Sequence, residues 1–169
     1  MLLAGPALAT EIGEIDVRAL PPEKHAHAAN DRSSLWLETK TRMTAMLIDP
    51  AGRRLGVEAT TYKVVKGIPG ADCTADFVAN PYTGDEHAEA YERMTIAPAL
   101  KGVYKLQLHG LQTGPYEISA AALSRDGSSE PSKSLEGMIS EGEDQTLELN
   151  FDPAPHATLS WVDTSGQRP

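Results

Sequence analysis

The residues from Lys101 to Asp152 alternate between apolar and polar side chains, and this period of two constrains the fold more than any other feature. Within Gly102–Gly110, the side chains of Tyr104, Leu106 and Leu108 share one face, and the residues between them share the other. Such alternation is typical of a strand with one buried face. It predicts that Tyr104 and Leu106 are core residues and that Lys105 lies at the surface.

Other alternating runs follow at short intervals. Tyr116–Ala120 comes after the turn-forming stretch Leu111–Pro115, and two such runs around a short loop predict a β-hairpin. A further hairpin is predicted over Leu135–Phe151, with its turn at Ser140–Asp144. Arg125–Ser132 is a second turn cluster. Several short strands between turns predict an all-β fold, an antiparallel β-sandwich of the jelly-roll-like or immunoglobulin-like kind.

Shorter patterns extend this prediction to the rest of the chain. Asp49–Gly52 indicates a β-turn with proline at its second position. Gly67–Gly84 is rich in glycine and proline steps and predicts a loop. Residues 85–94 have helix propensity, but the alternation that ends at Met94 and Ile96 favours a strand over 91–97. Further strands are predicted over Ser34–Glu38, Arg42–Ile48, Thr60–Val65 and Ala157–Val162.

The two ends of the chain differ in composition from its middle. Met1–Ala9 is apolar and ends in Ala-Leu-Ala, which indicates the remnant of a signal peptide, with a short apolar strand as the alternative. Thr10–Ser34 is predicted as an N-terminal arm and linker, with an edge strand over Thr10–Leu20 that covers a sheet edge or joins a neighbour's sheet. The sandwich domain is predicted over 35–162, and 163–169 as a flexible tail.

Charge and cysteine content narrow the function. The 169 residues carry a net charge of −9, which argues against binding to nucleic acid or to anionic membranes. The single cysteine, Cys73, forms no intrachain disulfide and is predicted to be a buried thiol. No apolar run approaches the ~20 residues of a membrane-spanning helix.

Two motifs resemble those of a known family. Met46–Leu55 is similar to the strand, Asp-Pro-x-Gly turn and leucine of bacterial secreted β-sandwich modules, and Gly102–Leu108 with Gly114–Ala120 is similar to their paired Gly-x-Tyr strands. The chain thus resembles the pre-peptidase C-terminal domain family over about Leu35–Ala122. The resemblance implies a sandwich that accompanies secreted proteins in accessory roles. Calcium, which acidic residues bind in that family, is not supported, because Arg42–Ala45 lacks a carboxylate and Ala51 replaces the usual Asp or Asn.

Motifs for catalysis are absent from the sequence. There is no nucleophile elbow, zinc-protease helix, phosphate loop or dinucleotide fingerprint. The sequence therefore assigns no catalytic, cofactor-binding or metal-ligating residue and no cofactor. Several residue pairs could carry chemistry in principle but are interpreted as solvated surface groups: His25 and His27, Asp72 and Asp76, Glu86 and Glu89, and Glu141 and Glu143.

The aromatic residues are few, and two tryptophans bear on binding. Tyr104 and Tyr116 are predicted in the core, while Trp36 and Trp161 are either core residues or, if outward, stacking platforms. The sequence predicts a non-catalytic, extracytoplasmic module for adhesion, assembly or protein contact, whose partner is another protein or a surface polymer. A carbohydrate-binding module and a small hydrolase are the alternatives.

Overall fold

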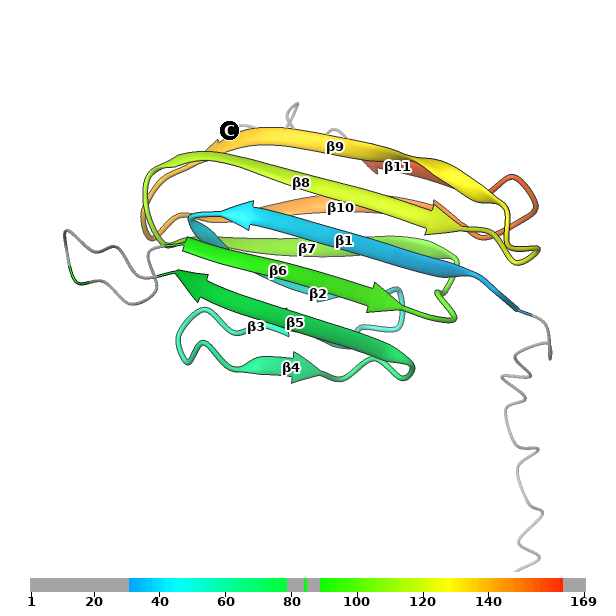
Figure 1. The fold of residues 1–169 in the computed structure, drawn as a ribbon, viewed down its shortest axis with the longest axis horizontal. Coiled ribbons are helices and arrows are strands. Elements are labelled where there is room, and N and C mark those ends of the chain that lie inside the picture. The colour runs from blue at the N-terminus through cyan, green and yellow to red at the C-terminus, as the bar shows by residue number, and fades with distance from the viewer. Residues whose placement is uncertain (1–30, 79–83, 85–88, 163–169) are drawn as a thin grey trace, which may run out of the picture.

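The computed structural model describes residues 31–78, 84 and 89–162, and these form two antiparallel sheets packed face to face (Figure 1). The five-stranded sheet, here sheet A, has the order β5-β6-β1-β8-β9. Its strands are β1 Ser34–Thr41, β5 Ala71–Val78, β6 Glu89–Ile96, β8 Gly114–Leu123 and β9 Ser129–Ile139.

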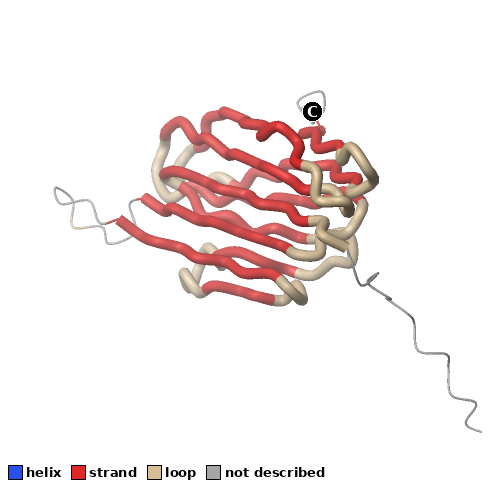
Figure 2. Tube along the Cα trace, turned by 45° about the vertical axis from the view of Figure 1, so that its right-hand side comes forward, coloured by secondary structure: helices blue, strands red, loops and turns tan. Residues whose placement is uncertain are grey.

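The six-stranded sheet, here sheet B, has the order β11-β10-β7-β2-β3-β4. Its strands are β2 Met43–Ile48, β3 Arg54–Val57, β4 Val64–Lys66, β7 Gly102–Gly110, β10 Asp144–Asp152 and β11 Thr158–Val162. The described residues contain strands and loops but no helix, so none of them forms a helix that could cross a membrane (Figure 2). The predicted all-β antiparallel sandwich is confirmed.

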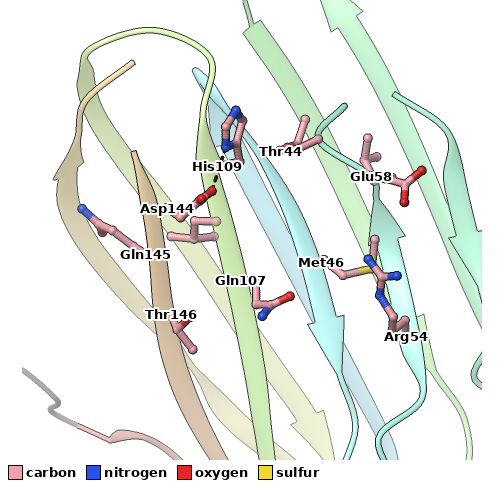
Figure 3. Close-up of a pocket in the computed structure, with 12 residues that line it drawn as sticks. Thr44, Met46, Arg54, Glu58, Gln107, His109, Asp144, Gln145 and Thr146 are labelled. Atoms are coloured by element: carbon pink, nitrogen blue, oxygen red, sulfur yellow. Dashed lines mark hydrogen bonds and ion pairs between the residues drawn. The ribbon is translucent and has the colours of Figure 1, made fainter. Parts of the chain in front are cut away.

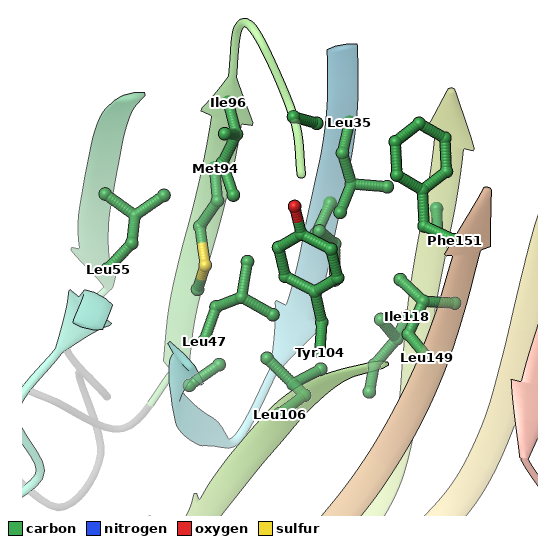
Figure 4. Packing of buried hydrophobic residues seen from close by; sticks show 14 of the residues in the cluster. Leu35, Leu47, Leu55, Met94, Ile96, Tyr104, Leu106, Ile118, Leu149 and Phe151 are labelled. Atoms are coloured by element: carbon green, nitrogen blue, oxygen red, sulfur yellow. The ribbon is translucent and has the colours of Figure 1, made fainter. Parts of the chain in front are cut away.

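The inner faces of both sheets supply one hydrophobic core. Tyr104 and Leu106 of β7 are completely buried, as are Leu35 and Ile118 of sheet A (Figure 4). The Tyr104 hydroxyl donates to the Leu100 carbonyl oxygen at 3.0 Å, as expected for a tyrosine-corner-like residue. The alternation in Gly102–Gly110 therefore identified the buried face correctly, and Tyr116, at 6% exposure, is also a core residue as predicted.

The two predicted hairpins are wrong. β7 pairs with β2 and β10 in sheet B, whereas β8 pairs with β1 and β9 in sheet A. The stretch Leu111–Thr113 is thus a crossing between sheets, held by Leu111 and Gln112 amides that donate to the Arg42 carbonyl oxygen at 2.6 and 3.2 Å. β9 and β10 likewise belong to different sheets. The apolar faces of β7 and β8 lie on opposite sides of the same core, so both are buried between the two sheets.

Two further predictions need correction. Residues 71–78, predicted as loop, form edge strand β5, whose backbone pairs with β6 along its length. The strand predicted over Thr60–Val65 is only Val64–Lys66, because Glu58–Lys63 is a turn in which the Tyr62 amide donates to the Glu58 carbonyl oxygen. Arg54–Val57, for which no strand was predicted, is β3.

Several other predictions are confirmed. β6 bears out the strand near 91–97, and β11 bears out the last strand. The turn at Asp49 is closed by the Gly52 amide, which donates to the Asp49 carbonyl oxygen at 2.8 Å, and Gly52 has the positive φ of 79° that favours glycine. The predictions for Met1–Ala9, the arm Thr10–Leu20, His25, His27, Glu86 and the tail 163–169 lie outside the described residues.

Candidate functional site

The outer face of sheet B carries a polar groove of about 260 Å³, here called the sheet B groove (Figure 3). Residues that alternate with the core positions of β2, β7 and β10 form its floor, and the Glu58–Lys63 turn contributes one wall. The residues that line it include Thr44, Met46, Arg54, Glu58, Gln107, His109, Asp144 and Thr146.

Strand register arranges the floor in two rows across the sheet. One row is Asp144, His109 and Thr44, which lie directly opposite one another on β10, β7 and β2. In the next row, Gln107 lies between Thr146 and Met46. Cross-strand neighbours on one face have Cβ atoms about 4.5–5.5 Å apart, so the side chains of each row lie next to one another.

A hydrogen bond fixes one end of the groove. Nδ1 of His109 lies 2.7 Å from Oδ1 of Asp144, and the two side chains are 33% and 83% exposed. An exposed pair of this kind contributes little stability, about 0–1 kcal/mol, but it orients the imidazole and leaves its other nitrogen available to a ligand.

The opposite side of the groove carries charges of both signs. Arg54 is exposed, and its guanidinium makes no hydrogen bond or ion pair with any described residue. Glu58 accepts a hydrogen bond from the Thr61 hydroxyl at 2.7 Å. Figure 3 shows both residues across the groove from Asp144 and Thr146. The groove thus combines a cation, two carboxylates, an imidazole and an amide, a set suited to hydrogen bonding with a polar chain.

The Asp144–His109–Thr44 row has the residue types of a hydrolase triad but not its geometry. Thr44 is only 1% exposed, so a substrate cannot reach its hydroxyl. No hydrogen bond joins Thr44 to His109 among the described contacts, although a nucleophile must contact its base. The row therefore lacks the geometry of a hydrolase triad.

Cys73 is placed where it cannot act as a nucleophile. It is 3% exposed on the inner face of β5, and burial raises the pKa of its thiol to about 12. The thiolate is the reactive form, so a thiol kept neutral in the core is inert. The prediction of a buried free cysteine is confirmed.

The other sequence candidates are scattered. Asp72 and Asp76 are exposed on β5, and Lys66 forms an ion pair with Asp72 at 2.5 Å, which lowers the pKa of Asp72. Glu143 caps its own turn, because its Oε2 accepts the Ser140 amide at 2.7 Å. No cluster of three or more His, Cys, Asp or Glu side chains suitable for a metal ion occurs within the described part of the chain.

The two tryptophans have different surroundings. Trp161 packs against the core from β11. Trp36 is partly exposed on the outer face of sheet A, between the small register neighbours Thr95 and Ala121. Next to it on β1, Glu38 accepts a hydrogen bond from the Tyr91 hydroxyl and pairs with Arg93 at 3.5 Å. Sequence patterns had left the orientation of Trp36 open.

Comparison with protein families, curated proteins and solved structures finds no match for this chain. The fold and the groove together define it as an antiparallel β-sandwich domain with a polar sheet face. The resemblance to the pre-peptidase C-terminal domain family stays a prediction.

Proposed function

We propose that this domain is a non-catalytic binding module that holds a polar segment of another protein in the sheet B groove. The observation that carries the proposal is the groove itself: hydrogen-bonding side chains from adjacent strands line a shallow outer face. A segment lying across β10, β7, β2 and β3 would contact both rows at once. The proposed setting is extracytoplasmic, as the apolar N-terminal residues predict.

The charges of the groove favour a segment that carries both signs. Arg54 offers a site for a carboxylate, since a guanidinium binds carboxylates through two parallel hydrogen bonds. Asp144 and Glu58 offer acceptors for an amine or an amide. Gln107, between them, has an amide that makes no hydrogen bond with a described residue and offers both a donor and an acceptor.

The test is a peptide array probed with the purified domain, followed by titration of the peptides that bind. The double variant Arg54→Ala/Gln107→Ala should bind at least about tenfold more weakly, because it removes two hydrogen-bonding groups from the interface. Asn150→Ala, on the same outer sheet face but outside the groove, is the matched control and should bind like the wild type. Equal binding by all three proteins would contradict the proposed site.

The proposal that the domain is non-catalytic is tested separately. The purified chain should show no saturable turnover of model ester, glycoside or peptide substrates. Turnover that survives repurification and is lost in His109→Ala would support the hydrolase alternative instead.

A second candidate function, binding of a polysaccharide, is favoured by Trp36. An indole ring on a flat sheet face, flanked by small side chains and next to hydrogen-bonding groups, suits stacking on a sugar ring. In a Trp161→Phe background, Trp36 is the only tryptophan and reports binding by fluorescence. Titration with soluble chito- or cello-oligosaccharides should change this emission only if the face binds sugar, and Trp36→Phe should abolish retention on the insoluble polymer.

A further inference from the structure

Glu92 is a carboxyl group enclosed in the hydrophobic core. It lies on the inner face of β6 in series with Met94 and Ile96, and its exposure is 0%. Its Oε1 accepts the Ala45 backbone N–H at 2.9 Å. Because Ala45 belongs to β2, this hydrogen bond joins sheet A to sheet B through the core.

The second oxygen of the same carboxyl has no such partner. Oε2 of Glu92 and the hydroxyl oxygen of Thr39 are both buried, and neither has a hydrogen-bond partner among the described residues. Thr39 on β1 is the direct register neighbour of Glu92. Directly opposed residues have Cβ atoms about 4.5–5.5 Å apart, so the two unpartnered oxygens belong to neighbouring side chains on one face.

A neutral acid fits these surroundings and a carboxylate does not. A buried charge without a counter-charge costs much more than a neutral group, so the carboxyl takes up a proton instead. A hydrogen on Oε2 needs an acceptor, and because the Thr39 hydroxyl does not bond it directly, one buried water between the two oxygens would supply it. Oε1 meanwhile keeps the Ala45 amide.

The strands packed around Glu92 offer no positive charge to compensate an anion. β5 contributes Ala75, its register neighbour, and Cys73, whose buried thiol is neutral and whose own pKa is raised further by Glu92. β1 contributes Thr39, and β2 contributes the Ala45 amide. The inner-face residues of β3, Leu55 among them, are apolar.

We propose that Glu92 is a proton-dependent clasp between the two sheets, which is closed when its carboxyl is neutral and opens when it ionises. The closed clasp holds β6 to β2 through the Ala45 amide. Ionisation opens it because the buried anion has no counter-charge and gains from reaching water, although the Ala45 amide alone favours the anion. The inference concerns the core and stands independently of the function proposed for the sheet B groove. Glu92 is nevertheless connected to that groove through Ala45, because the residues on either side of Ala45, Thr44 and Met46, form part of the groove floor.

The direction of the pH effect follows from the two states. Burial raises the pKa of Glu92 to about 8, and the Ala45 hydrogen bond opposes this only in part. In the unfolded chain the pKa is near the ordinary 4.5. The stabilising contribution of the neutral form is therefore fully present below about pH 4.5 and is lost progressively as the pH rises to about 8.

The test measures melting temperatures from pH 5 to pH 9 for the wild type, Glu92→Gln and Glu117→Gln. Glutamine copies the neutral acid, since it keeps an acceptor for Ala45 and a donor for Thr39 but cannot ionise. Relative to the wild type, Glu92→Gln should gain on the order of 10 °C between the two ends of this range. Glu117→Gln, the same exchange at an exposed position of β8, should keep the wild-type profile.

A measurement on the wild type decides the matter even if the glutamine variant does not fold. In ¹³C NMR spectra of the side-chain carboxyls, one glutamate resonance should titrate near pH 8, far above the ordinary value of about 4.3. Titration of every glutamate below pH 6 would overturn the proposal. So would parallel pH profiles of melting temperature for the wild type and Glu92→Gln.

Discussion

The two faces of sheet B are built from the same strands, yet one is buried in the core and the other is a polar surface. On β7, the inward residues Tyr104 and Leu106 are fully buried, while the outward residues Gln107 and His109 line a polar groove. A buried polar group in the interior costs free energy unless a partner or a proton satisfies it, as at Glu92. The groove leaves Arg54 and Gln107 without described partners, at no comparable cost because water reaches them.

This difference separates stability from binding at the level of single residues. Substitutions at inward positions should change the free energy of unfolding, and substitutions at outward positions should change ligand contact. The predictions below test that separation, beginning with the largest expected effect.

The first prediction compares neighbours on β7. Tyr104→Ala or Leu106→Ala should lower the free energy of unfolding by roughly 2–5 kcal/mol, because each leaves a cavity in the core. Lys105→Ala, on the outward face, should change it by no more than about 0.5 kcal/mol. Urea denaturation measures all three. Equal losses would mean that the two faces of β7 are not distinct.

The second prediction concerns a polar group on the interior side. Asp49 is 4% exposed; its Oδ1 accepts the amides of Ala51 and Arg53 at 2.9 and 2.8 Å, and its Oδ2 accepts Nε of Arg53 at 2.7 Å. Asp49→Ala should cost about 1–3 kcal/mol, because two turn amides lose their acceptor. Asp49→Asn keeps an acceptor oxygen and should cost less. The same denaturation experiment ranks them, and a reversed order would refute this account of the turn.

The third prediction concerns Gly56 of β3, whose backbone passes close to that of β2. Gly56 has a φ of 139°, and a Cβ there would lie 2.2 Å from the Ala45 carbonyl oxygen. Gly56→Ala should cost roughly 1–3 kcal/mol through backbone strain. Gly52 also has a positive φ, of 79°, but nothing lies within 4 Å of a Cβ added there. Gly52→Ala should therefore lower the free energy of unfolding by less than Gly56→Ala. Thermal melts of the two variants compare backbone strain with a steric clash, at position 56, and backbone strain without one, at position 52.

The smallest effect is expected in the groove. His109→Ala removes an exposed pair with Asp144 and should change stability by no more than about 0.5 kcal/mol. The same variant should weaken binding of any peptide that the array identifies. A large loss of stability would show that the pair is structural, and the comparison between the faces would then fail.

The candidate site was only partly predictable from sequence. Alternation placed Gln107 and His109 on the outward face of their strand, and this was correct. It did not bring His109 to Asp144, 35 residues later, because the strand was predicted to pair with its successor instead of with β10. The sequence did indicate on which face Glu92 lies. It is two and four residues before Met94 and Ile96, and residues two apart in a strand share a face. The complete burial of Glu92 was not predictable in the same way, because it depends on the second sheet, which covers that face.

The chain by itself determined which side of β7, β8 and β10 is buried, where the Asp49 turn falls, and that the fold is all β. These are local properties, fixed by side-chain alternation and by the φ preferences of proline and glycine. Only the tertiary structure decided which strands pair. The segment Leu111–Thr113 is as short as a hairpin loop, so its length does not distinguish a hairpin from a crossing between sheets. Burial of the apolar faces of both flanking strands in one core selects the crossing. That choice also assembled the groove and enclosed Glu92.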